Sequence, residues 1–437
     1  MGDNCHDPDH SLPFAAMAIA AESVTEVCRR ARAASLLLPA VTTADKDAAL
    51  TALARLLREQ TAEILEANGV DHDAGRDAGL DDALLDRLRL DPERVEAMAV
   101  GVEAVIALED PVGELLERRT LESGIEMEHR RVPIGVVAIV YEARPNVTVD
   151  AAALCLKSGN AAVLRGSSSA AASNAILVEI VRRAVAEASL PVGSVEAVAR
   201  GGREELGELA RQRDLVDLII PRGGEGLKAA LEEVAEVPIL YAASGNCHVY
   251  VDADADLGMG RSIAYNAKVQ RPGVCNAAET LLVHEAIAEE FLPDVLGDLH
   301  DAGVELVGDE RTRAAAAGMP IGAAGDDDWD REYHGLKMAV AVVDSVAAAI
   351  DHVNRHGSGH SEAIVTGSDA AASAFTGGVD AACVYVNAST RFTDGFEFGM
   401  GAEIGNSTQK LHARGPIGLR ELTSTKYVLR GSGQTRG

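Results

Sequence analysis

The spacing of apolar residues changes along the chain. Within residues 48–67, and again within 94–108, apolar residues recur every three or four positions with charged residues opposite them. This is the pattern of amphipathic helices. Residues 126–131 instead alternate between apolar and polar, as an exposed strand does. The pattern therefore predicts that residues from about 15 to 117 are mainly helical and that a strand follows them.

From residue 136 onward, short apolar runs alternate with amphipathic segments. The expected strands are residues 136–140, 161–164, 195–198, 215–220, 238–241 and 249–251, followed by 339–343 and 363–366. The expected helices are residues 173–188, 204–212, 287–297 and 347–354, with one more after the turn at 221–226. This alternation is typical of doubly wound parallel sheets. Two such sets in series predict two α/β domains with a cleft between them, which is a usual location for a binding site.

Composition limits the classes of protein that the chain can be. Its 437 residues exceed one ordinary core, and 47% hydrophobic residues with 3% aromatics predict interiors of Ala, Val, Leu and Ile. The net charge of −28 argues against a nucleic-acid partner, which requires a basic surface. It also resembles the composition of proteins from salt-loving (halophilic) organisms. Residues 13–21 are apolar but short and follow acidic residues, so we expect neither a membrane span nor an export signal, and we expect a cytoplasmic protein.

Cys275 is the candidate nucleophile among the six cysteines. The six lack the paired spacing of a zinc site or a disulfide framework. Cys275 lies in a turn of small residues, shortly after Lys268 and Arg271 and before the apolar run 281–283. Nearby positive charge lowers the pKa of a thiol and favours the reactive thiolate. A buried, unreactive cysteine is the alternative, and this segment by itself does not exclude it.

Two turns between a strand and a helix are candidates for binding phosphate. The glycine fingerprint of dinucleotide-binding domains, GxGxxG after the first strand, is absent. Backbone N–H groups at a helix N-terminus can nevertheless hold phosphate oxygens. The residues of these turns are Arg165, Gly166, Ser167 and Ser168 in one case and Gly223 and Gly224 in the other. Either could equally be a tight turn without a ligand.

Four blocks of sequence together resemble the gamma-glutamyl phosphate reductase family of the aldehyde dehydrogenase superfamily. They are residues 141–150, with Arg144 and Asn146; 270–276, around Cys275; 356–364; and 385–395, with Arg391 and Thr393, continuing to 409–416. The resemblance implies an aldehyde dehydrogenase-like α/β fold with two doubly wound domains and a small β oligomerisation arm. The NADPH-binding domain would comprise residues 12–120 and 134–245, the catalytic domain 246–400, and the arm 121–133 and 415–432. The superfamily binds its nicotinamide cofactor without the glycine fingerprint, which would explain its absence here.

The resemblance also implies a reaction. The family reduces L-glutamate 5-phosphate with NADPH to L-glutamate 5-semialdehyde and phosphate, the second step of proline biosynthesis from glutamate. Cys275 would displace phosphate to form a thioester, which hydride would then reduce. The Asn146 side chain and the Cys275 backbone N–H match the superfamily's donors to the oxyanion, and losing one such donor typically costs about 10²–10³ in rate. The alternatives are a reductase for another acyl phosphate or acyl-CoA, and a scaffold that has lost catalysis.

Few cations accompany these blocks, so they are candidates for binding an anionic substrate. Arg144, Lys157, Lys268, Arg271 and Arg391 could hold the phosphate or the α-carboxylate, and Thr393 is a further candidate ligand. Each cation could instead form a structural ion pair.

Three features bear on the cofactor and on the direction of the reaction. Glu332 resembles the superfamily's glutamate that holds the nicotinamide ribose. The turn 165–169 has hydroxyls and no acid to repel a 2′-phosphate, which favours NADPH over NADH. Residues 241–245 hold no carboxylate, whereas oxidising members carry a general-base glutamate there, so reduction is favoured.

The expected partners follow from the same reasoning. The strand-like runs 126–131 and 426–429 could pair with another subunit, which predicts a homo-oligomer, either a dimer or a tetramer. Channelling of substrate from glutamate 5-kinase is a further possibility that the resemblance raises. We expect no metal, no nucleic acid and no membrane among the partners.

Overall fold

The structure is a computed structural model that describes residues 22–198, 202–241, 244–316 and 318–436. The apolar run expected at 13–21 lies outside these residues. Among the residues described, no helix is both long and apolar enough to cross a bilayer.

The N-terminal region is helical, as predicted. Its helices are α1 (Val24–Ser35), α2 (Thr43–Glu59), α3 (Thr61–Asp77), α4 (Asp82–Leu88) and α5 (Pro92–Ala107). The single helix expected over 48–67 is wrong in one respect, because it is broken at Gln60, whose backbone (φ −107°, ψ 23°) is not helical. Side-chain caps begin most of these helices, for example Thr42 before α2 and Asp91 before α5.

The first α/β unit contains a parallel sheet of order β5-β4-β3-β6. Its strands are β3 (Val136–Tyr141), β4 (Ala161–Arg165), β5 (Val195–Ala197) and β6 (Leu218–Arg222), and its helices are α6 (Asn146–Lys157), α7 (Ala171–Glu187), α8 (Arg203–Ala210) and α9 (Glu225–Val234). Every residue of β3 and β4 is buried, as their apolar sequences predict for all but Arg165 at the end of β4. The strand expected at 238–241 is wrong, because only Ile239 forms a bridge, with Ile219.

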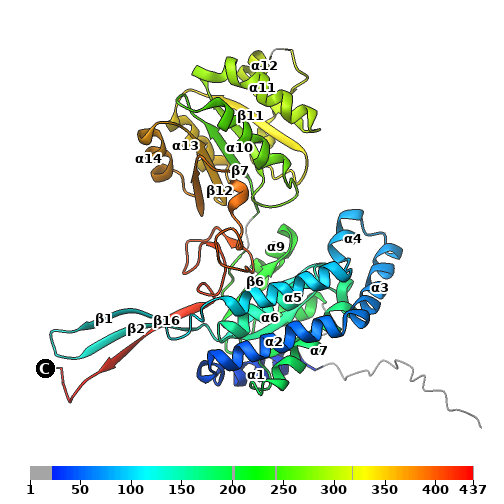
Figure 1. Cartoon of the computed structure of the whole chain (residues 1–437), viewed down its shortest axis with the longest axis vertical. Helices are drawn as coiled ribbons and strands as arrows, with labels where there is room; N and C mark the ends of the chain where they lie inside the picture. The colour runs from blue at the N-terminus through cyan, green and yellow to red at the C-terminus, as the bar shows by residue number, and fades with distance from the viewer. Residues whose placement is uncertain (1–21, 199–201, 242–243, 317, 437) are drawn as a thin grey trace, which may run out of the picture.

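The second α/β unit is a larger parallel sheet, of order β10-β9-β11-β8-β7-β12-β13. Its strands are β7 (Cys247–Val251), β8 (Ala278–His284), β9 (Glu305–Gly308), β10 (Gly322–Ala323), β11 (Lys337–Val343), β12 (Ser361–Val365) and β13 (Cys383–Val386). Its helices are α10 (Leu257–Val269), α11 (Ala288–Asp301), α12 (Glu310–Ala315), α13 (Val346–His356) and α14 (Asp369–Gly378). Figure 1 shows the two units one above the other, with β6 and α9 of the first unit directed toward the second. The prediction of two doubly wound domains is confirmed.

A narrow antiparallel sheet projects from the first unit (Figure 1). It consists of β1 (Leu115–Thr120), β2 (Glu126–Pro133) and β16 (Thr423–Arg430), in the order β1-β2-β16. The run 426–429, which was expected to pair with another subunit, pairs with β2 of its own chain. The arm was expected to begin at residue 121, but the sheet begins at Leu115 because β1 is one of its strands.

The segment before β16 packs on the first unit. Ile404, Ala413, Ile417 and Leu419 are buried in the core formed by α2, α5, α6 and β3. A short ribbon of β14 (Asn406–Ser407) and β15 (Gly415–Pro416) stiffens the segment. Residues 415–422 were expected in the arm. They belong to the first unit instead, because their apolar side chains pack in its core.

Candidate active site

The turn that carries Cys275 lies between α10 and β8 and is held against the connection between the two units. A Cβ added to Gly245 would lie 1.4 Å from the Cys275 carbonyl oxygen and 2.6 Å from its Cα. Only glycine fits so close to another backbone. The same carbonyl accepts the thiol of Cys247, with a sulfur–oxygen distance of 3.2 Å. Cys275 itself stays partly exposed, whereas the other described cysteines are buried free thiols.

The block 385–395 fixes the turn from the other side. The Asn276 amide donates to the Thr393 carbonyl at 2.8 Å, and the Thr390 hydroxyl donates to the Asn276 carbonyl at 2.7 Å. The Thr393 hydroxyl is buried and bonded to the hydroxyls of Ser361 (2.6 Å) and Tyr385 (2.7 Å). The expectation that Thr393 binds substrate therefore gives way to a role in holding the turn, because its hydroxyl is already used inside the protein.

The Cys275 thiol is in an environment that resists ionisation. Burial raises its pKa to about 11, the Arg222 guanidinium opposes this rise, and the carboxylates of Glu332 and Glu403 add to it. Arg222 ends β6 in the first unit. The pKa of the Cys275 thiol, in the second unit, is therefore influenced by a cation of the first unit, which is the arrangement expected of a site between two domains.

Asn146 is the first residue of α6, which follows β3 through a strained loop. Ala143 in that loop has a φ of 42°, which is uncommon for a residue with a side chain. One N–H of the Asn146 amide donates to Asp150 at 2.9 Å. The bond fixes the orientation of the amide and leaves its second N–H for an oxyanion. Burial raises the pKa of Asp150 to about 6.

The lysines expected to bind anions are structural. Lys268 is fully buried and forms an ion pair with Glu279, with an Nζ–Oε2 distance of 2.5 Å. Burial lowers the pKa of Lys268 and raises that of Glu279. Lys157 is equally buried and pairs with Asp47 at 2.5 Å. The expectation that these lysines bind substrate is wrong, because each has a carboxylate partner and no exposed surface for a ligand.

The arginines behave differently from the lysines. In the part of the chain that the structure describes, the side chains of Arg87, Arg144, Arg222 and Arg271 form no hydrogen bond and no ion pair. Burial lowers the pKa of Arg144 to about 10, and the charges of Arg222, Arg87 and Arg271 add to this effect. Arg144 therefore lies among three other cations, from α4, the end of β6 and the Cys275 turn, and none of the four forms an ion pair in the part of the chain described. Arg222 also acts on the carboxyls of Glu403 and Asp150. The net positive charge of such a group suits an anionic ligand.

Arg391 adds a fifth positive charge to this group. Its Nε donates to Gln270 at 2.7 Å, and the nearby charge of Arg271 contributes to a lowered pKa, after the larger effect of burial. We call Arg87, Arg144, Arg222, Arg271 and Arg391 the arginine cluster. The sequence reasoning missed Arg87 and Arg222. Arg222 stands in the turn that was singled out for its glycines, whereas Arg87 lies in the short helix α4, which carries no motif.

The two turns expected to bind cofactor follow the carboxyl ends of β4 and β6, the strands on either side of β3. A Cβ at Gly166, after β4, would lie 2.0 Å from the Asn174 amide, and Ser168 is exposed. Ser167 accepts the Ala143 N–H at 3.2 Å, which joins this turn to the Asn146 loop. Arg165 is buried and donates to the Gly202 carbonyl, so its side chain faces the interior.

The second turn, after β6, is already in contact with a carboxylate side chain of the protein. Gly224 donates its N–H to Glu142 at 3.3 Å, and a Cβ at Gly223 would lie 2.6 Å from the same carboxylate oxygen. A cofactor phosphate at this turn would have to replace Glu142. Glu332, the expected ribose ligand, has a side chain that is 11% exposed and lies 3.4 Å from His334. Its influence on the pKa of Cys275 puts it beside the nucleophile.

Comparisons with known proteins agree with this geometry. The family model described as the aldehyde dehydrogenase family matches residues 4–318. A gamma-glutamyl phosphate reductase of Kineococcus radiotolerans is 52% identical over 417 residues, which are 95% of this chain and 96% of that protein. One from Thermobifida fusca is 52% identical over 94% of this chain and 98% of its own length. The chain belongs to the gamma-glutamyl phosphate reductases of the aldehyde dehydrogenase family.

A solved structure supports the same family and its fold. The gamma-glutamyl phosphate reductase of Thermotoga maritima matches with a TM-score of 0.93 and 46% identity, over 95% of this chain and all of that one. The aldehyde dehydrogenase-like fold, expected from the four sequence blocks, is therefore confirmed.

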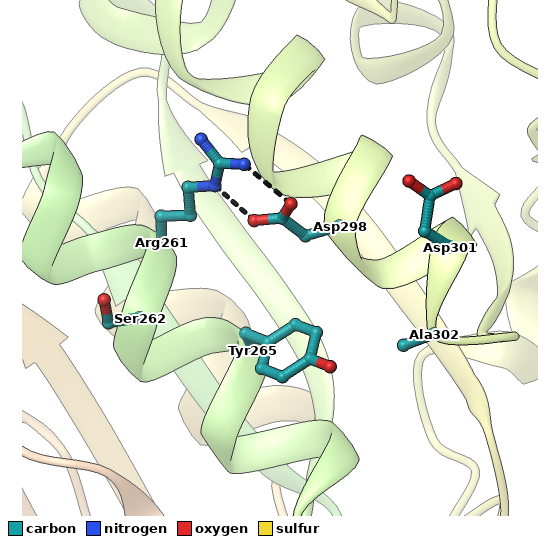
Figure 2. Close-up of a pocket in the computed structure, with 6 residues that line it drawn as sticks. All are labelled: Arg261, Ser262, Tyr265, Asp298, Asp301 and Ala302. Carbon is teal, nitrogen blue, oxygen red and sulfur yellow. Dashed lines mark hydrogen bonds and ion pairs between the residues drawn. The ribbon is translucent and has the colours of Figure 1, made fainter.

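A surface hollow elsewhere in the chain is not a second candidate for the active site. It has a volume of about 540 Å³ and lies between α10 and α11. Figure 2 shows Arg261 in this hollow already engaged by Asp298, with Asp301 close by. With its cation neutralised by carboxylates, this surface suits neither a phosphate nor a carboxylate ligand, and none of the expected site residues lines it.

Proposed function

We propose that this chain reduces L-glutamate 5-phosphate with NADPH to L-glutamate 5-semialdehyde and phosphate, as the second step of proline biosynthesis from glutamate. The observation that carries the proposal is the arginine cluster around Cys275. An acyl phosphate with an α-carboxylate brings at least two anionic groups to one site, and a cluster of unpaired arginines can bind them. The names of the relatives that share half of its residues agree with this substrate.

In this proposal Cys275 acts as the nucleophile. Its thiolate attacks the carbonyl carbon of the acyl phosphate, the bond from that carbon to the phosphate oxygen breaks, and a thioester remains on the enzyme. Arg222 favours the thiolate that this step needs. After reduction the carbon–sulfur bond breaks, so the aldehyde leaves and Cys275 is regenerated as the thiolate.

Two donors are proposed to stabilise the oxyanions of both tetrahedral states. They are the free N–H of the Asn146 amide and the backbone N–H of Cys275. Asp150 and Gly245 act through them, since Asp150 orients the amide and Gly245 supports the Cys275 backbone. Donors that are fixed before the reaction stabilise a developing charge without reorganisation.

The cofactor is proposed to bind at the carboxyl edge of the first sheet. The order β5-β4-β3-β6 reverses direction beside β3, which is where open α/β sheets bind nucleotides. Gly166, Ser167, Ser168, Gly223, Gly224 and Glu332 are its proposed ligands, with the hydroxyls of the first turn suited to a 2′-phosphate. Arg165 would act only by supporting that turn. When bound, NADPH would supply the hydride that reduces the thioester.

The assembly and location of the protein are part of the same proposal. Strands β1 and β16 leave unpaired edges on the projecting sheet, and Tyr427 and Leu429 are more than half exposed there. Such edges pair readily with another chain, which supports a dimer or tetramer built through the arm. A cytoplasmic location fits the free thiols. Channelling from glutamate 5-kinase stays a prediction.

The experiment that tests the proposal measures the reaction in reverse. The enzyme should oxidise L-glutamate 5-semialdehyde in the presence of phosphate and NADP, which is followed as NADPH formation. Cys275→Ser should abolish this activity while leaving NADPH binding, measured by fluorescence titration, close to wild type. Substantial activity in Cys275→Ser, or no dependence on phosphate in the wild type, would contradict the proposed function.

A further inference from the structure

The proposed substrate carries a group that the arginine cluster cannot bind. Besides its acyl phosphate and α-carboxylate, L-glutamate 5-phosphate has an α-ammonium, which needs an acceptor. In an extended substrate that nitrogen lies about 5 Å from the carbonyl carbon that Cys275 attacks, since four single bonds separate the two atoms. A carboxylate close to Cys275 that has an acceptor atom to spare is therefore the strongest partner for this group.

Most acids near Cys275 are already used. Glu279 is in the buried ion pair with Lys268. Asp150 accepts the Asn146 amide, and Asp394 accepts the N–H of Phe396 two residues later. Two carboxylates act directly on the Cys275 thiol, those of Glu332 and Glu403.

Glu332 is proposed above for the cofactor ribose. Glu403 has no role in the mechanism so far. Its Oε2 atom is buried and has no hydrogen-bond partner in the described part of the chain. The backbone N–H of Gly395 also acts on this carboxyl, so the protein uses part of its acceptor capacity and Oε2 remains available to a donor from a ligand.

Contacts in the protein hold Glu403 close to the nucleophile. Asn276, which follows Cys275, is bonded to the Thr393 carbonyl at 2.8 Å. Gly395 follows two residues later, and a Cβ built on it would lie 3.0 Å from the Glu403 Cβ. The stem of the Glu403 side chain therefore packs against the loop that fixes the Cys275 turn.

The backbone beside Glu403 is anchored in the other unit. Ile404 is buried in the core of the first unit, and its N–H donates to the Ile417 carbonyl at 2.9 Å. Arg222 acts on both the Glu403 carboxyl and the Cys275 thiol, so these two groups share one electrostatic environment. Glu403 is therefore fixed between the units, in the same electrostatic environment as Cys275.

We propose that Glu403 binds the α-ammonium of the substrate and makes the enzyme specific for an acyl phosphate of an α-amino acid. This inference rests on the proposed function and deepens it. Burial raises the pKa of Glu403 to about 7, with Arg222 opposing the rise. A bound ammonium favours the ionised carboxylate, so substrate binding is coupled to loss of a proton from Glu403 near neutral pH.

The test compares two aldehydes that differ only in the amino group. Kinetics of the phosphate- and NADP-dependent oxidation are measured with L-glutamate 5-semialdehyde and with 5-oxopentanoate, which lacks the ammonium. In Glu403→Gln the preference for the amino aldehyde, as the ratio of kcat/KM values, should fall roughly 10- to 100-fold, mainly through KM, because a charged hydrogen bond is lost. Glu403→Asp keeps the charge and should retain part of the preference.

Glu397→Gln is the matched control, since Glu397 is an exposed glutamate of the same loop, and it should keep the wild-type preference. The thermal midpoint of each variant shows whether it is folded. Three results in Glu403→Gln would overturn the role of Glu403 but leave the proposed function standing. They are an equal loss of kcat/KM with both aldehydes, a fall in kcat with KM unchanged, and an unaltered preference. A wild-type enzyme without preference for the amino aldehyde overturns the proposed function together with it.

Discussion

Replacing Gly245 by alanine should disable the enzyme although Gly245 itself has no side chain that could take part in the chemistry. Gly245 lies just before β7, where the chain enters the second unit. Its alanine Cβ would lie 1.4 Å from the Cys275 carbonyl oxygen, 2.3 Å from the carbonyl carbon and 2.6 Å from the Cα. All three are backbone atoms, so no side chain can turn aside to make room.

The distances set the size of the effect. Ordinary contact begins at 3.4 Å, so one of the two backbones has to move by about 2 Å. A misplacement of about 1 Å at a reacting centre costs on the order of 10²-fold in rate. The displaced atoms include the N–H proposed to hold the oxyanion. We therefore expect kcat to fall by at least about 10²-fold, together with a loss of stability of about 1–3 kcal/mol from overpacking.

The assay combines steady-state kinetics with labelling of Cys275 by iodoacetamide. Gly297→Ala is the control, since Gly297 lies within α11 of the same unit and its added Cβ meets nothing within 4 Å. That variant should keep its activity and gain roughly 0.5–1 kcal/mol, the usual advantage of alanine over glycine in a helix. A Gly245→Ala enzyme with wild-type kcat and labelling rate would refute the reasoning, because it would mean that the Cys275 turn tolerates displacement.

Three further predictions follow from the buried charges of the site. Lys268→Met should lower the free energy of unfolding, measured in urea, by about 3–5 kcal/mol, because it leaves Glu279 without its partner. The double variant Lys268→Met/Glu279→Gln should recover much of that loss. A raised KM at unchanged stability would instead show that Lys268 is a substrate ligand. In the enzyme without substrate, alkylation of Cys275 should rise about tenfold per pH unit toward its pKa of about 11, and a plateau near neutral pH would contradict the raised pKa of the thiol. Because ionised Asp150 orients Asn146, wild-type kcat should fall as pH drops through the Asp150 pKa of about 6, whereas Asp150→Asn should have a lower kcat and lack this inflection.

The elements with strong local signals were predictable from the sequence. The uniformly apolar runs of β3 and β4 and the small-residue turn around Cys275 depend on neighbours in sequence, and both are where the patterns predicted. The break in the long N-terminal helix was not visible, since residues on both sides of Gln60 favour a helix. The isolated bridge at Ile239 was misread as a strand because a short apolar run fits a strand and a buried loop equally well.

The errors at Lys268 and Lys157 have a single physical origin, the distinction between paired and unpaired charge. Lys268 and Lys157 looked like anion ligands because their partners, Glu279 and Asp47, identify themselves only in three dimensions. Arg222 was passed over although it stands in the turn whose glycines were chosen. Sequence spacing shows which residues carry charge, but only the fold shows which charges remain uncompensated.

The distribution of those uncompensated charges suggests how the two units cooperate. Arg87, Arg144 and Arg222 come from the first unit, whereas Arg271 and Arg391 come from the second. Like charges repel, and that repulsion contributes to the lowered pKa of Arg144. An anion bound between the units replaces this repulsion by attraction to both sides. The substrate's own charge thus favours the arrangement in which the arginines of the two units lie on either side of it.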